Sequence, residues 1–434
     1  MKKGKMNRIL LALVLILALS LTACGSRETP LKQEGAAGFV PKLDRSTRGK
    51  VSVVGHYNNF EALEAEFNRF AEYYPEVEMS YTFLDDYNGI IVTALESSEA
   101  PDIFFSYPWM AYREGYDSVY ENAEDLADPA LGIGLGCIRD GLLYRTADGR
   151  VPSVPVYTTT YGMLVNEDLF AKEKITPPAT YEELIRACEA LKKAGYASPV
   201  MAYNSSGMML FPLYYPFFCA GIQGNAQALE SLNGMKPGAG EYIRGAMKLA
   251  EDFAGRGFLD PESCGKLEND YNAVIMRFFE GDVPMMLASA NTVSGTEKRE
   301  GQSEAFSAHP FRYSFHPVPS TAEGGYFINT ISMGFSVNRN SKNLEMANEF
   351  MRFLVSTEEL NRMARAKRMV TPCKDMSLDG VYAAFGKVPA DRFINLSELG
   401  LADTPDAQVR RAGWQVANGA LTAEEAVKAF GTLE

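Results

Sequence analysis

Histidine is scarce in this 434-residue chain, and the residues that usually carry catalysis do not cluster. The three histidines are His56, His309 and His316, and no H-E-x-x-H motif or Cys/His group accompanies them. A zinc site is therefore not expected. The chain also lacks a G-x-S-x-G nucleophile elbow and a phosphate-binding P-loop. We accordingly predict no catalytic residue, no metal and no cofactor.

Cysteines at metal-ligand or redox spacing are absent as well. The six cysteines are widely scattered and include no C-x-x-C. Apart from Cys24 they number an odd five: Cys137, Cys188, Cys219, Cys264 and Cys373. Cys188 falls on the apolar face of an expected helix. We therefore expect most of the five to be buried thiols, and a disulfide stays open as an alternative.

The amino-terminal apolar run is too short for a membrane-spanning helix, which needs about 20 residues. Residues 9–19 are apolar, follow a basic head that contains no acid, and precede Leu21-Thr22-Ala23-Cys24. This order is typical of a secretory signal. The last four residues resemble a bacterial lipobox, which implies that residues 1–23 are a lipoprotein signal peptide and that Cys24 carries the lipid anchor. An ordinary secretory peptide with an incidental cysteine is the alternative.

Positive charge is in deficit in the rest of the chain. Without the four basic residues of the signal, 38 basic and 55 acidic residues remain, a net charge of −17. This balance argues against nucleic acid and anionic membrane surfaces as partners. Residues 24–49 are polar without apolar periodicity, so we predict a flexible tether. The roughly 385 residues that follow are too many for one core and fit two lobes.

Strand and helix patterns alternate after the tether. Apolar periodicity predicts a strand at residues 50–54, a helix at 60–73, a strand at 77–83, a helix at 87–96 and a strand at 102–105. Such alternation predicts an α/β fold with mainly parallel sheets, whose ligand-binding loops follow the carboxyl ends of the strands.

The stretch from Gly149 to Gly195 has clear boundary signals. Asn166 is placed to cap a short helix, Thr180 and Glu183 make a capping box for a longer one, and Gly195 stands where that helix should end. A G-x-x-x-x-x-P loop opens the stretch, and V-N-E-D-L-F and P-P-A-T-Y-E-E-L follow. Elsewhere the chain contains F-N-R-F-A-E-Y-Y-P-E-V-E-M, A-P-D-I-F-F, F-E-G-D-V-P-M-M and L-T-A-E-E-A-V-K.

In this order, the pieces resemble the extracellular solute-binding proteins of ABC transporters, and most closely the sugar- and oligosaccharide-binding branch to which maltose-binding proteins belong. The resemblance covers nearly the whole mature chain. It implies a two-lobed periplasmic-binding-protein-like fold joined by crossover strands. Residues 50–158 and 290–336 would form lobe one, and residues 159–289 and 337–434 lobe two.

The same resemblance implies a function. The chain would be a lipid-anchored, extracytoplasmic monomer that captures a small-molecule solute, expected to be a carbohydrate, in a cleft between the lobes and delivers it to the transmembrane subunits of an ABC permease. Two alternatives stay open. One is a secreted carbohydrate-active enzyme, and the other is a ligand-sensing partner of a membrane receptor.

Candidate ligand-binding residues follow the expected strands of lobe one. Tyr57, Asn58 and Asn59 come directly after the first strand, and Tyr107 and Trp109 come after the third. Loops at the carboxyl ends of parallel strands are where ligands bind, and an aromatic face there can stack on a sugar. For Trp109, packing in the core is the alternative.

Further candidates lie at the crossings and in other loops. Thr159 and Tyr161 belong to the first crossover, where plain β-propensity is the alternative. Asp86 is expected in a polar turn that can bind a sugar hydroxyl, because adjacent carboxylates such as Asp85-Asp86 rarely make a glycosidase pair. Asn291 stands just beyond the second crossover motif, where related chains often carry Gly and Trp. Trp414 lies near a stacking aromatic of the maltose-binding branch, with core packing as the alternative.

Overall fold

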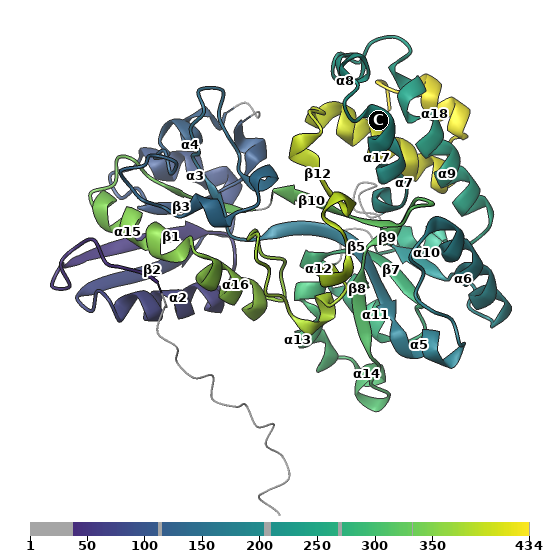
Figure 1. Ribbon diagram of the computed structural model, residues 1–434, viewed down its shortest axis with the longest axis horizontal. Helices are drawn as coiled ribbons and strands as arrows, with labels where there is room; N and C mark the ends of the chain where they lie inside the picture. The colour runs from purple at the N-terminus through teal and green to yellow at the C-terminus, as the bar shows by residue number, and fades with distance from the viewer. Residues whose placement is uncertain (1–37, 112–114, 204–209, 268–270, 332, 434) are drawn as a thin grey trace, which may run out of the picture. The chain divides into compact units, whose positions relative to one another are not determined.

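The computed structural model describes residues 38–111, 115–203, 210–267, 271–331 and 333–433. The described residues from Pro41 onward belong to one unit, which is built around two sheets (Figure 1). The predicted signal peptide and Cys24 lie outside the described residues. Within the described ranges, no helix is both long enough and apolar enough to cross a membrane.

Three separate segments of the sequence build the first sheet. Its order is β2-β1-β3-β11-β4, with β1 at Gly49–Gly55, β2 at Val77–Phe83, β3 at Ile103–Ser106, β4 at Val154–Pro155 and β11 at Gly334–Val337. Strand β1 runs parallel to β2 and to β3. Strand β11 runs antiparallel to β3 and to β4.

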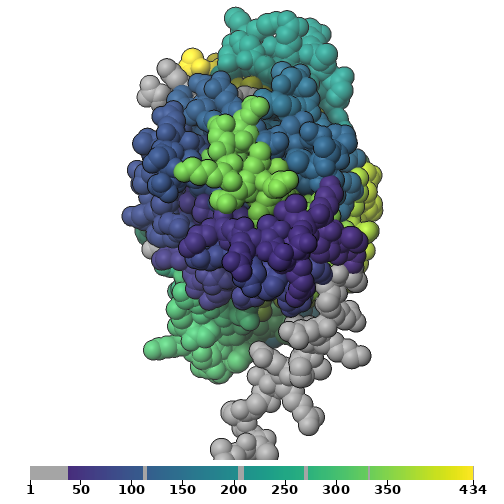
Figure 2. All heavy atoms as spheres, turned by 90° about the vertical axis from the view of Figure 1, so that its left-hand side faces the viewer, coloured from purple at the N-terminus to yellow at the C-terminus, as the bar shows by residue number. Residues whose placement is uncertain are grey.

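Helices from the beginning and from the last third of the sequence cover this sheet. They are α2 (Glu61–Ala71), α3 (Tyr87–Glu96), α4 (Asp117–Glu121), α15 (Leu344–Leu354) and α16 (Thr357–Ala366), with short 3-10 turns η1 (Pro108–Ala111), η2 (Leu135–Cys137) and η3 (Asp140–Leu142). Helix α15 packs on β1, β11 and α2, and α16 packs on α2. Figure 2 shows the green residues of this late segment against the purple amino-terminal ones. We call the first sheet with these helices lobe one.

The second sheet has β5 (Thr158–Asn166) near its centre, with all nine residues buried. Its order is β12-β10-β5-β7-β6, and β8 and β9 pair with β5 and β10. The other strands are β6 (Val200–Ala202), β7 (Met285–Ser289), β8 (Tyr313–His316), β9 (Val318–Pro319), β10 (Gly325–Ile331) and β12 (Phe393–Asn395).

Helices with apolar faces surround the second sheet, and together they form lobe two (Figure 1). They are α5 (Glu167–Lys172), α6 (Tyr181–Lys193), α7 (Phe211–Ile222), α8 (Ala226–Asn233), α9 (Arg244–Gly255), α10 (Pro261–Gly265), α11 (Tyr271–Phe279), α12 (Ala290–Ser294), α13 (Thr296–Glu300), α14 (Glu304–Ala308), α17 (Asp403–Ala417) and α18 (Ala423–Ala429). Short 3-10 turns lie between them: η4 (Ala239–Ile243), η5 (Gly380–Tyr382), η6 (Phe385–Lys387), η7 (Ala390–Arg392) and η8 (Leu396–Glu398).

The two-lobed α/β fold class is confirmed, but the sheets are mixed rather than mainly parallel. Strand β5 is antiparallel to β7, β8 and β10. The chain enters lobe two along β5 and leaves it along β10, so these neighbours must run in opposite directions. Strand–helix alternation within one half of the chain does not reveal such return strands.

The sheets also divide the chain differently from the expected lobe boundaries. Residues 290–336 were expected in lobe one, yet β8 and β10 pair in the second sheet. Residues 337–434 were expected in lobe two, yet α15 and α16 pack on lobe one. Periodicity predicts a strand or a helix but not the sheet that it joins, and this choice depends on the tertiary packing.

The predicted tether to residue 49 is also too long. The backbone N–H of Lys42 donates to the carboxylate of Glu349 at 2.8 Å, and that of Leu43 donates to the hydroxyl of Tyr74 at 3.3 Å. Residues from Pro41 onward are therefore held on lobe one. Two backbone donors with side-chain acceptors leave no signal in the local sequence.

Candidate functional site

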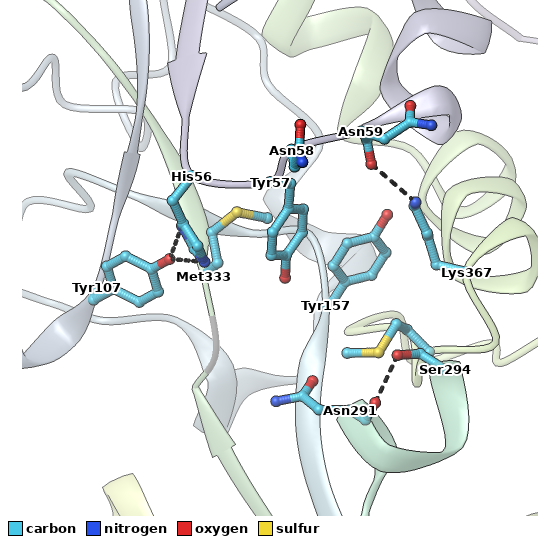
Figure 3. Close-up of a pocket in the computed structure, with 11 residues that line it drawn as sticks. His56, Tyr57, Asn58, Asn59, Tyr107, Tyr157, Asn291, Ser294, Met333 and Lys367 are labelled. Carbon is cyan, nitrogen blue, oxygen red and sulfur yellow. Dashed lines mark hydrogen bonds between the residues drawn. The ribbon is translucent and has the colours of Figure 1, made fainter. Parts of the chain in front are cut away.

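The carboxyl ends of β1 and β3 bring aromatic and amide side chains to one cavity. Because the two strands are parallel neighbours, the residues that follow them reach the same edge of the sheet. The cavity has a volume of about 440 Å³ (Figure 3), and its lining residues are His56, Tyr57, Asn58, Asn59, Tyr107, Tyr157, Asn291, Ser294, Met333, Lys367 and Met369. Sites for small molecules commonly fall in this range of size.

Tyr57 is held in place from both its backbone and its ring. Its N–H donates to the hydroxyl of Tyr81 at 3.0 Å, and that hydroxyl donates back to the carbonyl oxygen of Tyr57 at 2.9 Å. The ring packs edge-on against Phe60 and Phe105, with centroids 5.1 and 5.6 Å apart. Burial raises the pKa of Tyr57 to about 12, so the hydroxyl keeps its proton at neutral pH.

His56 and Tyr107 form an uncharged pair on one side of the cavity. The hydroxyl of Tyr107 lies 2.7 Å from Nδ1 of His56. Burial lowers the pKa of His56 and raises the pKa of Tyr107. Both groups are therefore neutral near pH 7, and a hydrogen bond rather than an ion pair orients the tyrosine ring.

Trp109 stands behind this pair instead of lining the cavity. It lies in η1, and its ring stacks on Tyr107 with centroids 5.8 Å apart and planes 17° apart. Tyr116 contacts the indole edge-on at 5.1 Å. Stacking of Trp109 on a ligand stays a prediction. Its contact with Tyr107 gives Trp109 a second role, which is to support the Tyr107 ring.

The other wall of the cavity comes from lobe two and from the segments between the lobes. Asn291 and Ser294 belong to α12, directly after β7. Met333 lies between β10 and β11, and Lys367 follows α16. The Nζ of Lys367 donates to the backbone oxygen of Asn59 at 3.2 Å, as Figure 3 shows.

Tyr157 lies between β4 and β5 and is completely buried. Its hydroxyl has no hydrogen-bond partner among the described residues. Buried polar groups are rarely left unpaired, because the lost hydrogen bonds with water are costly. Burial also raises the pKa of Tyr157, so the hydroxyl is a neutral donor. Its position on the cavity wall makes it a candidate partner for a ligand.

The chemistry of this wall suits a neutral ligand rich in hydroxyl groups. Among the described lining residues there is one lysine and no aspartate or glutamate. Amide and hydroxyl groups both donate and accept hydrogen bonds. Tyrosine rings offer faces to the C–H bonds of a ligand.

Five of the ten predicted ligand-binding residues line the cavity, namely Tyr57, Asn58, Asn59, Tyr107 and Asn291. They come from both lobes, so the fold gathers residues that lie more than 200 positions apart in the sequence. Whether they contact a ligand stays a prediction.

The other predicted residues lie outside the cavity lining. Asp86 is exposed and caps α3, where its carboxylate accepts from the backbone N–H of Gly89 at 3.3 Å. Thr159 is buried in β5 opposite Thr330. Tyr161 is also buried in β5, and its ring meets Phe211 edge-on at 4.8 Å. Trp414 is half-buried on α17, and like Trp109 it is not a lining residue.

Sequence reasoning missed six lining residues: His56, Tyr157, Ser294, Met333, Lys367 and Met369. His56 and Tyr157 had a usable signal, because they adjoin the strand-end and crossover residues that were predicted. Met333, Lys367 and Met369 had none, since only tertiary packing brings them to the cavity.

Comparisons with known proteins agree with this architecture. A family model described as bacterial extracellular solute-binding protein matches residues 55–360. No curated protein matches the chain. The apo form of RafE from Streptococcus pneumoniae superposes with a TM-score of 0.70 at 16% identity, over 89% of this chain and 97% of that chain. RafE in complex with raffinose gives a TM-score of 0.66 at 16% identity, over 88% and 98%. The GacH receptor of Streptomyces glaucescens, solved unliganded and with acarbose, gives 0.64 at 16% identity, over 89% and 97%.

Proposed function

Because this chain belongs to the bacterial extracellular solute-binding protein family, we propose that it captures a sugar or oligosaccharide in the cavity at the carboxyl ends of β1 and β3. Membership of the family implies an extracytoplasmic location. RafE and GacH, which share the fold, were solved with raffinose and with acarbose. Those ligands belong to those proteins, and they support a carbohydrate as the class to test here.

The observation that carries the proposal is the buried hydroxyl of Tyr157. It has no hydrogen-bond partner among the described residues, and it lines a cavity whose other lining residues include two tyrosines and three asparagines. A sugar hydroxyl would supply the missing hydrogen bond. Tyr57 and Tyr107 would cover the apolar face of the same sugar ring.

We propose binding without turnover. Hydrolysis of glycosides normally needs two carboxyl groups across the scissile bond, and no carboxylate is found among the lining residues that the structure describes. A ligand that contacts both lobes would favour their closed arrangement, which an ABC permease would then recognise. Delivery to a permease is part of this proposal.

Lipid anchoring is a separate part of the proposal. It rests on the lipobox at Leu21-Thr22-Ala23-Cys24. The Cys24→Ser variant, once exported, should be released from the membrane fraction, because it lacks the thiol that accepts the lipid. A variant that stays as membrane-bound as the wild type would show that Cys24 is not the anchor.

A panel of oligosaccharides tests the binding proposal. A ligand at a hundredfold excess over its Kd stabilises the folded chain by about 2.7 kcal/mol, which a thermal-shift assay detects. For a sugar found in this way, calorimetry should show weaker binding to Tyr157→Phe. One neutral hydrogen bond is worth about 0.5–1.5 kcal/mol, so the affinity should fall by roughly 2- to 12-fold.

Tyr181→Phe provides the matched control. Its hydroxyl is also buried without a hydrogen-bond partner among the described residues, but it lies outside the cavity lining. Both variants should keep the stability of the ligand-free chain, because each removes an unpaired polar group. Equal affinity of wild type and Tyr157→Phe would exclude Tyr157 as a ligand contact, and a panel without any binding sugar would contradict the carbohydrate proposal.

A further inference from the structure

Two cysteines that are far apart in the sequence meet at the junction of the lobes. Cys137 ends η2, and Cys373 lies in the segment that follows α16. An antiparallel bridge pairs Ile138 with Cys373. The N–H of Lys374 donates to the oxygen of Cys137 at 2.8 Å. The backbone thus holds the two cysteine positions side by side.

The two side chains also face each other. Each thiol shifts the pKa of the other: the neighbouring Cys373 raises the pKa of Cys137, and the neighbouring Cys137 lowers the pKa of Cys373. Cys137 is half-buried and Cys373 is fully buried. Of the two residues, only Cys137 therefore keeps surface that is open to solvent.

Arg139 gives the buried sulfur a favourable electrostatic environment. Its guanidinium donates to the carbonyl oxygen of Thr371 at 2.8 Å, and its backbone N–H donates to Pro372 at 3.0 Å. The hydrogen bond from Cys137, the hydroxyl of Thr371 and the charge of Arg139 lower the pKa of Cys373. A thiolate is the reactive form in disulfide exchange.

Two cysteines of lobe two, Cys188 and Cys264, have a different environment. Cys188 and Cys264 are buried in α6 and α10. Burial raises the pKa of Cys188 to about 12 and that of Cys264 to about 11. They stay protonated at neutral pH. The neighbouring Cys373 raises the pKa of Cys137 too, so the pair differs from them in holding one sulfur, that of Cys373, whose pKa is lowered.

We propose that Cys137 and Cys373 form an intramolecular disulfide outside the cell. The oxidant is an external disulfide, either of a thiol oxidoreductase or of a small thiol. Once the pair has lost one proton to solvent and the remaining proton lies on Cys373, the thiolate of Cys137 attacks the external disulfide, forms a mixed disulfide and releases one thiolate. Cys373 then attacks the sulfur of Cys137 and releases the second. The two cysteines lose two electrons and two protons, and the external disulfide becomes two thiols.

Proteins of this family are extracellular, and disulfides persist in extracytoplasmic compartments. The expected location of the chain therefore supports this reaction. The bond would join the loop before β4 to a segment that is also held on β5, where the N–H of Thr158 donates to Val370 at 2.9 Å. It would close a loop from residue 137 to residue 373 and restrict the unfolded chain. The proposal does not depend on the identity of the ligand.

Peptide mapping of the exported wild-type chain, purified without reductant, tests the proposal directly. Trypsin cuts after Lys and Arg, so Cys137 is released in residues 114–139 and Cys373 in residues 369–374. We expect these two peptides as one species that separates on reduction. The denatured chain should show two fewer alkylatable thiols than the reduced sample. In an oxidising buffer of reduced and oxidised glutathione, the reduced chain should re-form the bond.

Variants connect the bond to stability. Reductant should lower the Tm of the wild type, and Cys137→Ser and Cys373→Ser should lose this response. Cys264→Ser is the matched control, because it removes a buried thiol outside the pair and should keep the response. Full alkylation of both cysteines after oxidation, or a Cys137 recovered only with glutathione or a second chain, would overturn the proposal. The mapping of the wild type decides the question even if a variant does not fold.

Discussion

Glu66 lies in lobe one, away from the candidate site, and we predict that it makes the free energy of unfolding depend on pH. It faces α16 from α2 and is 1% exposed. The nearby guanidinium of Arg69 is committed to Glu359, with contacts of 2.9 and 2.6 Å, and approaches Glu66 only to 3.6 Å. Burial first, and then the neighbouring Glu359, raise the pKa of Glu66 from 4.5 to about 9.

The sign of the pH effect follows from these values. Between pH 4.5 and about 9, the folded chain keeps a proton on Glu66 that the unfolded chain has lost. The stabilisation that this bound proton gives to the folded chain is therefore fully present below pH 4.5 and is lost as the pH rises toward 9. One proton changes the free energy of unfolding by about 1.36 kcal/mol per pH unit. From pH 6 to pH 8, Glu66 alone should cost the fold about 2.7 kcal/mol.

Glu66→Gln isolates the contribution of Glu66 to the pH dependence of stability, because the amide has a similar shape and no charge at either pH. Urea denaturation at pH 6 and at pH 8 should show that the wild type loses about 2.7 kcal/mol more than the variant. Glu64→Gln on the exposed face of the same helix is the matched control and should behave as the wild type. Equal pH dependence in the wild type and Glu66→Gln would refute the assignment of a buried, protonated carboxyl.

Three further substitutions test local features. Thr180→Ala removes half of the capping box of α6 and should lower the free energy of unfolding by about 1 kcal/mol in a denaturation curve; no change would show that the cap is dispensable. Gly240→Ala places a Cβ against the backbone oxygen of Val427 and should cost about 1–3 kcal/mol in the same assay; an unchanged free energy of unfolding would show that this contact does not constrain the fold. Trp109→Ala should weaken the binding of a ligand measured by calorimetry, because the indole supports Tyr107; a large loss of stability with unchanged affinity would assign Trp109 to packing alone.

Much of the local structure could be predicted from the sequence. The bounds of β2 and α3 agree with the expected strand and helix at residues 77–83 and 87–96. Asn166 caps α5, and the capping box at Thr180 and Glu183 is present, as the residue types indicate. These features depend on side chains within a few positions of one another, so local sequence is sufficient to specify them.

The candidate site was only partly predictable, for the same reason. Tyr57 and Tyr107 could be found because each follows a strand, and parallel neighbours end at a common edge. Thr159 and Tyr161 were predicted from the crossover strand in which they lie. The pairing of β5 inside the second sheet buries them away from the cavity lining. Lys367 reaches the cavity only because α16 packs on α2.

The sequence by itself determined the class of the fold, most of the strands and helices, and the strand ends where a ligand should bind, because periodicity and capping act over short distances. The tertiary structure alone decided which sheet each later segment joins, which predicted residues meet around one cavity, and that Cys137 and Cys373 become neighbours. Those outcomes depend on contacts between residues more than 160 positions apart. Such contacts form only between surfaces that the folded chain brings together, so local sequence patterns do not indicate them.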